Sequence, residues 1–207
     1  MSLSPPLKAP SVQAMSHIAD WAEKVARELL KEELQRRWAH SQGVAAQAAS
    51  LADILGEQAD LIVAAAWLHD IGYSPAVAAT GFHPLDGARY LRDVRHAGTR
   101  LCRLVAHHSC ALIEAEERGL AGVLLAEFEP ERPELADALT YCDMTTGPDG
   151  RHLTVEERLA EIRTRYGRGH IVDRSIERAT PRIKNAARAI TGRLRRYPTN
   201  GVPEFCR

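Results

Sequence analysis

The segment 64–73, in which an apolar helical run ends in a His-Asp pair, limits the folds open to this chain more than any other feature. Its residues are Ala-Ala-Ala-Trp-Leu-His-Asp-Ile-Gly-Tyr. A run of Ala and Leu is typical of a buried helix, whose end would present His69 and Asp70 together. A neutral imidazole and a carboxylate can both reach one divalent cation, and the second carboxylate oxygen can bridge to a neighbouring one. One pair proves little by itself, so the rest of the chain must supply partners.

The composition favours helices along the whole chain. Of the 207 residues, 45% are apolar and only 5% aromatic, and Ala and Leu fill most of the apolar positions. No segment of useful length shows the two-residue alternation of a strand. We therefore predict an all-α fold, a compact single-domain helical bundle over residues 15–196. A flexible leader is expected over 1–14 and a flexible tail over 197–207, because both ends contain several prolines.

The charge balance and the cysteines limit which binding partners and which cellular location can be predicted. Lys plus Arg and Asp plus Glu both total 27, so no overall basic field indicates nucleic acid, and none is expected as a partner. The four cysteines show no CxxC spacing and no disulfide framework. The N-terminus lacks the apolar segment of a signal peptide, and nothing approaches the roughly 18 apolar residues of a membrane span. We predict a cytoplasmic protein that does not enter a membrane, and a homo-oligomer is left open.

Apolar residues at three- and four-residue spacing predict a series of helices. Pro84 suits the first turn of a helix that starts at His83, and Gly56 suits the end of a helix that includes Leu55. Gly and Pro predict loops over 72–81 and 145–152. The expected helices cover about 16–30, 44–55, 58–69, 83–94, 99–108, 111–128 with a break near Gly119 and Gly122, 133–143, 154–166 and 171–196.

Residues suited to metal binding lie at or near the ends of these helices. They are His40, the pair His69-Asp70, His83, the pair His107-His108, and Asp143. Each has an ordinary structural explanation when it is taken alone, such as a helix cap or a surface histidine. As an ordered set they resemble the HD superfamily of metal-dependent phosphohydrolases. The motifs are Arg-Trp-Ala-His-Ser at 37–41, Leu-His-Asp-Ile-Gly at 68–72, which matches the HDIG variant, and Tyr-Cys-Asp at 141–143.

The resemblance covers about residues 36–165 and implies a set of metal ligands. The first metal would be bound by His40, His69, Asp70 and Asp143. In binuclear relatives Asp70 would bridge to a second metal, completed by His83 and by His107 or His108. Neighbouring helical residues point about 100° apart, so we expect His107 as the ligand and His108 as a further ligand or a contact for the substrate phosphate.

Mixed imidazole and carboxylate ligands suit a divalent transition metal, and we expect two ions. Iron or manganese comes first, with zinc, cobalt and nickel also suited. A bound metal lowers the pKa of its water and neutralises phosphoryl charge, so His69 and Asp70 are the expected catalytic residues. Arg37 lies one turn before His40 and is expected to bind the substrate phosphate. Many dinucleotide-cleaving relatives have a Lys soon after the motif, where this chain has Tyr73 and Ser74.

The resemblance implies a metal-dependent phosphohydrolase that cleaves a phosphate ester of a small metabolite, and a nucleotide is the leading candidate for the substrate. Two alternatives stay open. Some binuclear-iron HD proteins with a similar ligand set are oxygenases, and an HD domain can also bind a ligand without turnover. The chain has no GxSxG, P-loop or GxGxxG motif, which removes the main competing mechanisms.

Overall fold

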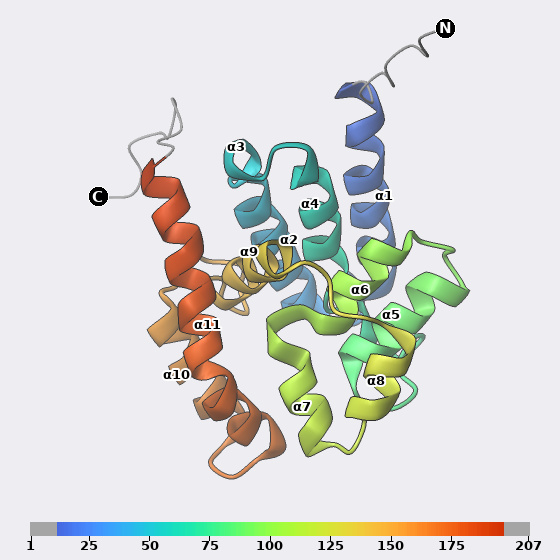
Figure 1. Ribbon diagram of the computed structural model, residues 1–207. Helices are drawn as coiled ribbons and strands as arrows, with labels where there is room; N and C mark the ends of the chain where they lie inside the picture. Colours follow the sequence, from blue (N-terminus) through green and yellow to red (C-terminus); the bar gives the residue numbers. More distant parts are fainter. Residues whose placement is uncertain (1–11, 197–207) are drawn as a thin grey trace, which may run out of the picture.

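The computed structural model describes residues 12–196, with side chains described from residue 17 onward. The elements, shown in Figure 1, are α1 (Val12–Leu30), α2 (Gln35–Ala49), α3 (Ala52–Leu55), η1 (Gly56–Gln58), α4 (Ala59–Leu68), η2 (Ile71–Tyr73), α5 (His83–Asp93), α6 (Thr99–His107), η3 (His108–Cys110), α7 (Ala111–Glu117), α8 (Ala121–Glu127), α9 (Pro133–Met144), α10 (Val155–Tyr166) and α11 (Ile171–Arg196).

The predicted all-α fold is confirmed. Within 12–196 the only β-type pairing is an isolated bridge between Thr146 and His152. Residues 12–14, which we had placed in a leader, belong to α1, whereas residues 1–11 and the predicted tail lie outside the described residues. Among the described helices, none combines the length and the apolar character needed to cross a bilayer.

Helix α4 forms the centre of the fold. Ile62, Ala64, Ala65, Ala66 and Leu68 are all fully buried. A helix that is apolar on every side is stable only when other elements surround it, and α4 packs against α1, α2, α6 and α9. Its alanines allow these neighbours to approach closely. The end of α4, where His69 and Asp70 follow, therefore lies deep inside the bundle.

Two hydrophobic cores flank the region where the predicted ligands meet. The larger core includes α4 and the helices around it. The smaller core lies among α9, α10 and α11 and includes Met144, Leu159, Ile162, Ile176 and Ile183. In Figure 1 the long α11 runs along one side of the bundle, and it packs against α7, α9 and α10.

Several predicted helix boundaries differ from the structure. The helix expected over 44–55 is two helices, because α2 starts at Gln35 and ends at Ala49 before the short α3. The apolar pattern continues across this break, since Leu51 is buried in the same core. The break expected within 111–128 lies at 118–120, where Gly119 has a positive φ of 72°, while Gly122 is inside α8.

Candidate metal centre

Six side chains from five regions of the chain form two adjacent groups, and all of them except the fully buried His69 line one pocket. His40 comes from the middle of α2, His69 and Asp70 from the end of α4, and His83 from the first position of α5. His108 follows α6, and Asp143 lies near the end of α9. One group consists of His40, His69 and Asp143, and the other of Asp70, His83 and His108. Within each group the potential ligand atoms lie within 4.8 Å of one another.

The first group is almost completely buried. His40 is 2% exposed, His69 0% and Asp143 6%. The Nε2 of His40 lies 2.9 Å from Oδ1 of Asp143, and the Nε2 of His69 lies 4.0 Å from the same oxygen. Two imidazole nitrogens and a carboxylate oxygen thus face a common point, an arrangement that suits a divalent cation.

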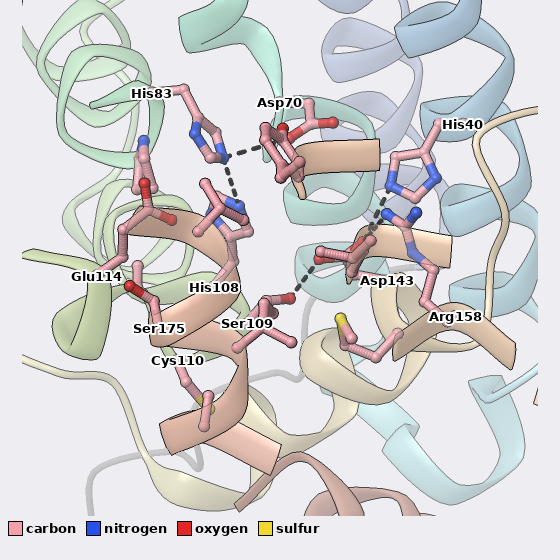
Figure 2. A pocket seen from close by; sticks show the side chains of 18 of the residues that line it. His40, Asp70, His83, His108, Ser109, Cys110, Glu114, Asp143, Arg158 and Ser175 are labelled. Atoms are coloured by element: carbon pink, nitrogen blue, oxygen red, sulfur yellow. Dashed lines mark hydrogen bonds and ion pairs between the residues drawn. The ribbon is translucent and has the colours of Figure 1, made fainter. Parts of the chain in front are cut away.

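Asp70 links the second group to the first. Its Oδ1 lies 3.4 Å from Nε2 of His83, which is in turn 3.1 Å from Nε2 of His108. The other carboxylate oxygen of Asp70, Oδ2, lies 3.6 Å from Nε2 of His69. Figure 2 shows Asp70, His83 and His108 on one side of the pocket, and His40 and Asp143 on the other. Asp70 therefore presents one oxygen to each group, which is the placement that a bridging ligand requires.

Backbone carbonyls determine which nitrogen of three imidazoles faces the pocket. The Nδ1 of His40 lies 3.0 Å from the Gly147 carbonyl oxygen. The Nδ1 of His69 and that of His108 each lie 2.7 Å from a carbonyl oxygen within their own chain segment. A carbonyl only accepts, so each Nδ1 carries the hydrogen and donates it. The Nε2 lone pair of all three rings is then directed toward the groups and is available to a metal.

His69 gives the clearest test of whether a cation fits. Its Nε2 is buried and has no hydrogen-bond partner among the described residues. An unpaired buried polar atom costs about 1–3 kcal/mol, so such atoms are rare in native proteins. A cation bound between His40, His69 and Asp143 would give this nitrogen a partner. The donor set, which is imidazole nitrogen with carboxylate oxygen, fits a divalent transition metal.

The surroundings keep these groups in their ligating protonation states. Burial alone would raise the pKa of Asp70, but Arg37 and the nearby imidazoles hold this pKa well below its usual range. Burial likewise acts against ionised Asp143, yet the ring of His40, whose Nε2 lies 2.9 Å from Oδ1, and the neighbouring positive charges hold the pKa of Asp143 well below the usual range. For His83 and His108, burial lowers the pKa, so both rings are neutral near pH 7.

A close backbone contact at Gly72 positions His83. A Cβ built on Gly72 would lie 2.0 Å from the carbonyl oxygen of His83, so only glycine allows η2 and the start of α5 to approach this closely. The loop before α5 is held by Asp86, whose Oδ2 accepts hydrogen bonds from the backbone N–H groups of Ala79 and Thr80, both at 3.0 Å. The Ile-Gly that follows His69-Asp70 thus has a structural role in bringing His83 to the pocket.

A second close contact positions the loop that holds His40. Gly150 has a positive φ of 79°, and a Cβ on it would lie 2.4 Å from the carbonyl oxygen of Ala39. A Cβ on Gly43 would lie 2.3 Å from the carbonyl oxygen of Gly150. The predicted loop over 145–152 is therefore packed directly on α2, where the Gly147 carbonyl accepts the hydrogen bond from His40.

Two residues with left-handed backbone conformations follow His108. Ser109 has φ 47° and Cys110 has φ 64°, values that non-glycine residues seldom adopt. This turn directs the Ser109 hydroxyl to Oδ2 of Asp143, to which it donates a hydrogen bond. The strained turn therefore contributes to both groups, because it follows directly on His108 and also orients Asp143.

The structure does not bring His107 to the pocket, contrary to our expectation. Helix α6 ends at His107, and the Nε2 of His107 donates to the carbonyl oxygen of Phe128 at 2.6 Å. His108 leaves the helix with ψ of 149°, which turns its ring toward His83. The two rings diverge because His108 lies outside the helix, and it is His108, not His107, that takes the ligand position.

Arg37 lies beside the second group. Its Nη1 donates to Oδ2 of Asp70 at 2.8 Å, and its guanidinium lies 3.8 Å from the centre of the Tyr73 ring. Tyr73 also stacks on His83 with ring centres 4.0 Å apart. Tyr73 is thus part of the site. Its contacts depend on tertiary packing, which no motif in the sequence indicated.

The C-terminal helices form part of the remaining pocket wall. Tyr166 of α10 accepts a long hydrogen bond of 3.5 Å from Arg37, and Arg158 of α10 lies 3.7 Å from Asp143. Helix α11 contributes small and apolar side chains, among them Ser175 and Ile176. We had identified none of these as site residues. The buried face of α10, with Arg158 between Val155 and Ile162, is the one signal that would have indicated an internal arginine.

Comparison with known proteins agrees with this geometry. The family model described as HD domain matches residues 37–162, from Arg37 in α2 to the middle of α10, and includes all six ligand candidates. Searches of curated proteins and of solved structures found no significant match. HD domains are generally metal-dependent phosphohydrolases, and the two His/Asp groups indicate divalent metal binding. The match covers more than half of the chain, which therefore belongs to the HD-domain family.

Proposed function

We propose that this protein is a metal-dependent phosphohydrolase that cleaves a phosphate ester of a small metabolite, first of all a nucleotide. The observation that supports this most directly is the position of Asp70. Its two oxygens face separate ligand groups, and Oδ2 also accepts a hydrogen bond from Arg37, which lines the same pocket. A phosphate in this pocket would meet both the metal centre and a guanidinium.

The chain holds the reacting groups in place, and a bound divalent cation would supply a nucleophilic hydroxide near pH 7 and would polarise the phosphate. His40, His69 and Asp143, together with Asp70, would hold one ion. Asp70, His83 and His108 would hold a second, so we replace His107 by His108 in the proposed ligand set. The carbonyl contacts of His40, His69 and His108 keep these rings oriented, which limits the reorganisation needed when substrate binds.

Arg37 is the proposed contact for the substrate phosphate. Its side chain is 21% exposed, and the stacked Tyr73 ring and the hydrogen bond to Asp70 restrict its position. A guanidinium presents paired N–H donors whose geometry matches two phosphoryl oxygens. Held in this way, Arg37 would orient the phosphate and neutralise part of its charge without losing much side-chain freedom on binding.

The test is elemental analysis of the purified protein followed by a phosphate-release screen. We expect about two transition-metal ions per chain, with iron or manganese first, and release of phosphate from one or more nucleotides. Removing the metal with a chelator should abolish release, and adding Mn²⁺, Fe²⁺, Co²⁺ or Ni²⁺ should restore it. If no phosphomonoester were hydrolysed with any of these metals, the proposal would be wrong.

The second ligand group also suits oxygenase chemistry. Because Asp70, His83 and His108 lie together, the protein would be able to hold two iron ions. An oxygenase that uses such a binuclear iron centre is the alternative to a hydrolase. Oxygen consumption by the iron-loaded protein in the presence of a phosphonate or a polyol, without phosphate release, would favour that alternative. Binding of a nucleotide without turnover or oxygen consumption would instead favour a non-catalytic HD module.

A further inference from the structure

A second pocket lies beside the metal centre, and most of the residues that line it are arginines. Its walls are formed by Arg36, Arg37, His40, Pro148, Arg158 and Arg165. Arg37, His40, Arg158 and Arg165 also line the pocket at the metal centre. The two pockets therefore adjoin each other, and we call the second one the arginine pocket.

The arginine pocket has more guanidinium groups than carboxylates to pair with them. Glu161 is shared by Arg158 at 2.6 Å and Arg165 at 2.5 Å. Arg36 makes no ion pair with any residue in the described part of the chain, and it lies exposed at the start of α2. Arg37 pairs with Asp70, and Arg158 lies 3.7 Å from Asp143 in addition to its pair with Glu161; Asp70 and Asp143 are proposed metal ligands. With cations bound to those two carboxylates, the pocket would carry a clear positive charge.

Arg158 is the most unusual member of the arginine pocket. It is only 4% exposed, although arginine is seldom buried unless it is fully paired. Its Nη1 binds Glu161, but its Nε is buried and has no hydrogen-bond partner among the described residues. A buried guanidinium with an unused donor costs free energy, which an anionic ligand in this pocket would offset.

The arginines come from two helices that tertiary packing brings together. Arg36 and Arg37 lie in the first turn of α2, whereas Arg158 and Arg165 lie two turns apart on α10. The family match covers residues 37–162, so Arg36 and Arg165 lie just outside the matched segment and Arg37 and Arg158 lie within it.

We propose that the arginine pocket binds a second phosphate group of the substrate, separate from the one that is hydrolysed. This inference rests on the proposed function. One phosphate would lie against the metal centre and Arg37, while the other would accept hydrogen bonds from Arg36, Arg158 and Arg165. Guanidinium forks match the several oxygens and the double charge of a phosphate better than they match a hydroxyl or an amide. The substrate class is therefore a small molecule phosphorylated at two positions.

Steady-state kinetics on two nucleotides test the proposal. Phosphate release from adenosine 3′,5′-bisphosphate is compared with release from adenosine 5′-monophosphate, using the metal-loaded protein and its Arg36→Gln and Arg165→Gln variants. Both arginines lie on the surface side of the pocket, whereas buried Arg158 is left unchanged because its loss would endanger folding. Arg163→Gln is the matched control, since Arg163 lies on the same helix but does not line the arginine pocket.

We expect the wild-type kcat/KM to be at least about tenfold higher for the bisphosphate than for the monophosphate. The reason is that hydrogen bonds between a guanidinium and an ionised phosphate are stronger than those between neutral groups. Arg36→Gln and Arg165→Gln should each remove most of this preference through KM, with little effect on the monophosphate, and Arg163→Gln should keep it. Equal kcat/KM for the two nucleotides, or a preference that survives both substitutions, would overturn the proposal while phosphate release still supported the hydrolase.

If the wider screen shows no phosphate release with any metal, the proposed function fails. In that case, or if only these two nucleotides are not hydrolysed, calorimetry with the same two nucleotides tests the arginine pocket separately. Tighter binding of the bisphosphate than of the monophosphate to the metal-loaded protein, lost in Arg36→Gln and Arg165→Gln but kept in Arg163→Gln, would support the pocket. Equal binding of the two nucleotides, or a difference that the two substitutions do not change, would overturn it.

Discussion

His107 and His108 are neighbours in the sequence, yet their imidazoles serve different parts of the molecule. The Nε2 of His108 lies 3.1 Å from Nε2 of His83 inside the metal centre, whereas the Nε2 of His107 donates to the Phe128 carbonyl 2.6 Å away. The reason is local, because α6 ends at His107 and His108 takes an extended ψ. This separation allows the two roles to be tested with a pair of otherwise similar variants.

Replacement of His108 with Ala should remove one ligand of the second group. We expect metal content, measured by elemental analysis, to fall by about one ion per chain, and phosphate release to fall by about a hundredfold or more. His107→Ala should keep the metal and most of the activity, and lose only about 1 kcal/mol of unfolding free energy with its hydrogen bond to Phe128. The opposite pattern would return His107 to the ligand set.

Asp70→Ala should have a larger effect than any single histidine substitution. It removes both carboxylate oxygens, one facing each ligand group, and also leaves Arg37 without its carboxylate partner. We expect metal content near background and a loss of phosphate release of about a thousandfold or more. Asp93→Ala, which changes an exposed carboxylate at the end of α5, is the control. An Asp70→Ala protein with full metal content and activity would contradict the proposed mechanism.

Gly72→Ala should disturb the metal centre without touching a ligand. The added Cβ would overlap the His83 carbonyl oxygen, so either η2 or the start of α5 must move. We expect a loss of about 1–3 kcal/mol in unfolding free energy, measured by urea denaturation, together with a lower affinity for the second metal. Gly98→Ala is the matched control, because a Cβ there would meet no atom within 4 Å. Equal stability of the two variants would show that the contact is unimportant.

Substitution of Arg37 should affect substrate more than metal. Arg37→Gln and Arg37→Lys are both expected to retain the metal, since neither changes a ligand, and to lower kcat/KM for phosphate release. The glutamine variant should lose about a hundredfold and the lysine variant less, because lysine keeps the charge but not the paired donors. Metal content is measured alongside the kinetics. Unchanged kcat/KM in Arg37→Gln would remove Arg37 from the phosphate contact.

The amino-acid sequence by itself determined the helical fold and the kinds of group that meet in the pocket. Ala- and Leu-rich periodicity is a local property, so it predicted α4 as a buried helix and placed His69 and Asp70 at its end. His40, His83 and Asp143 could also be selected, because their order along the chain resembles that of a known family. Pro84 and the loop over 145–152 were likewise recognisable, since the conformations of proline and glycine depend little on distant residues.

Only the tertiary structure decided which side chains complete the site. Whether His107 or His108 faces the metal centre depends on the residue at which α6 ends, and helix ends are set by packing as much as by sequence. Arg158, Arg165 and Tyr166 could not be identified, because their position next to α2 results from the packing of α10 far along the chain. A single helix face cannot reveal what lies opposite it, and for that reason the arginine pocket became visible only in the folded protein.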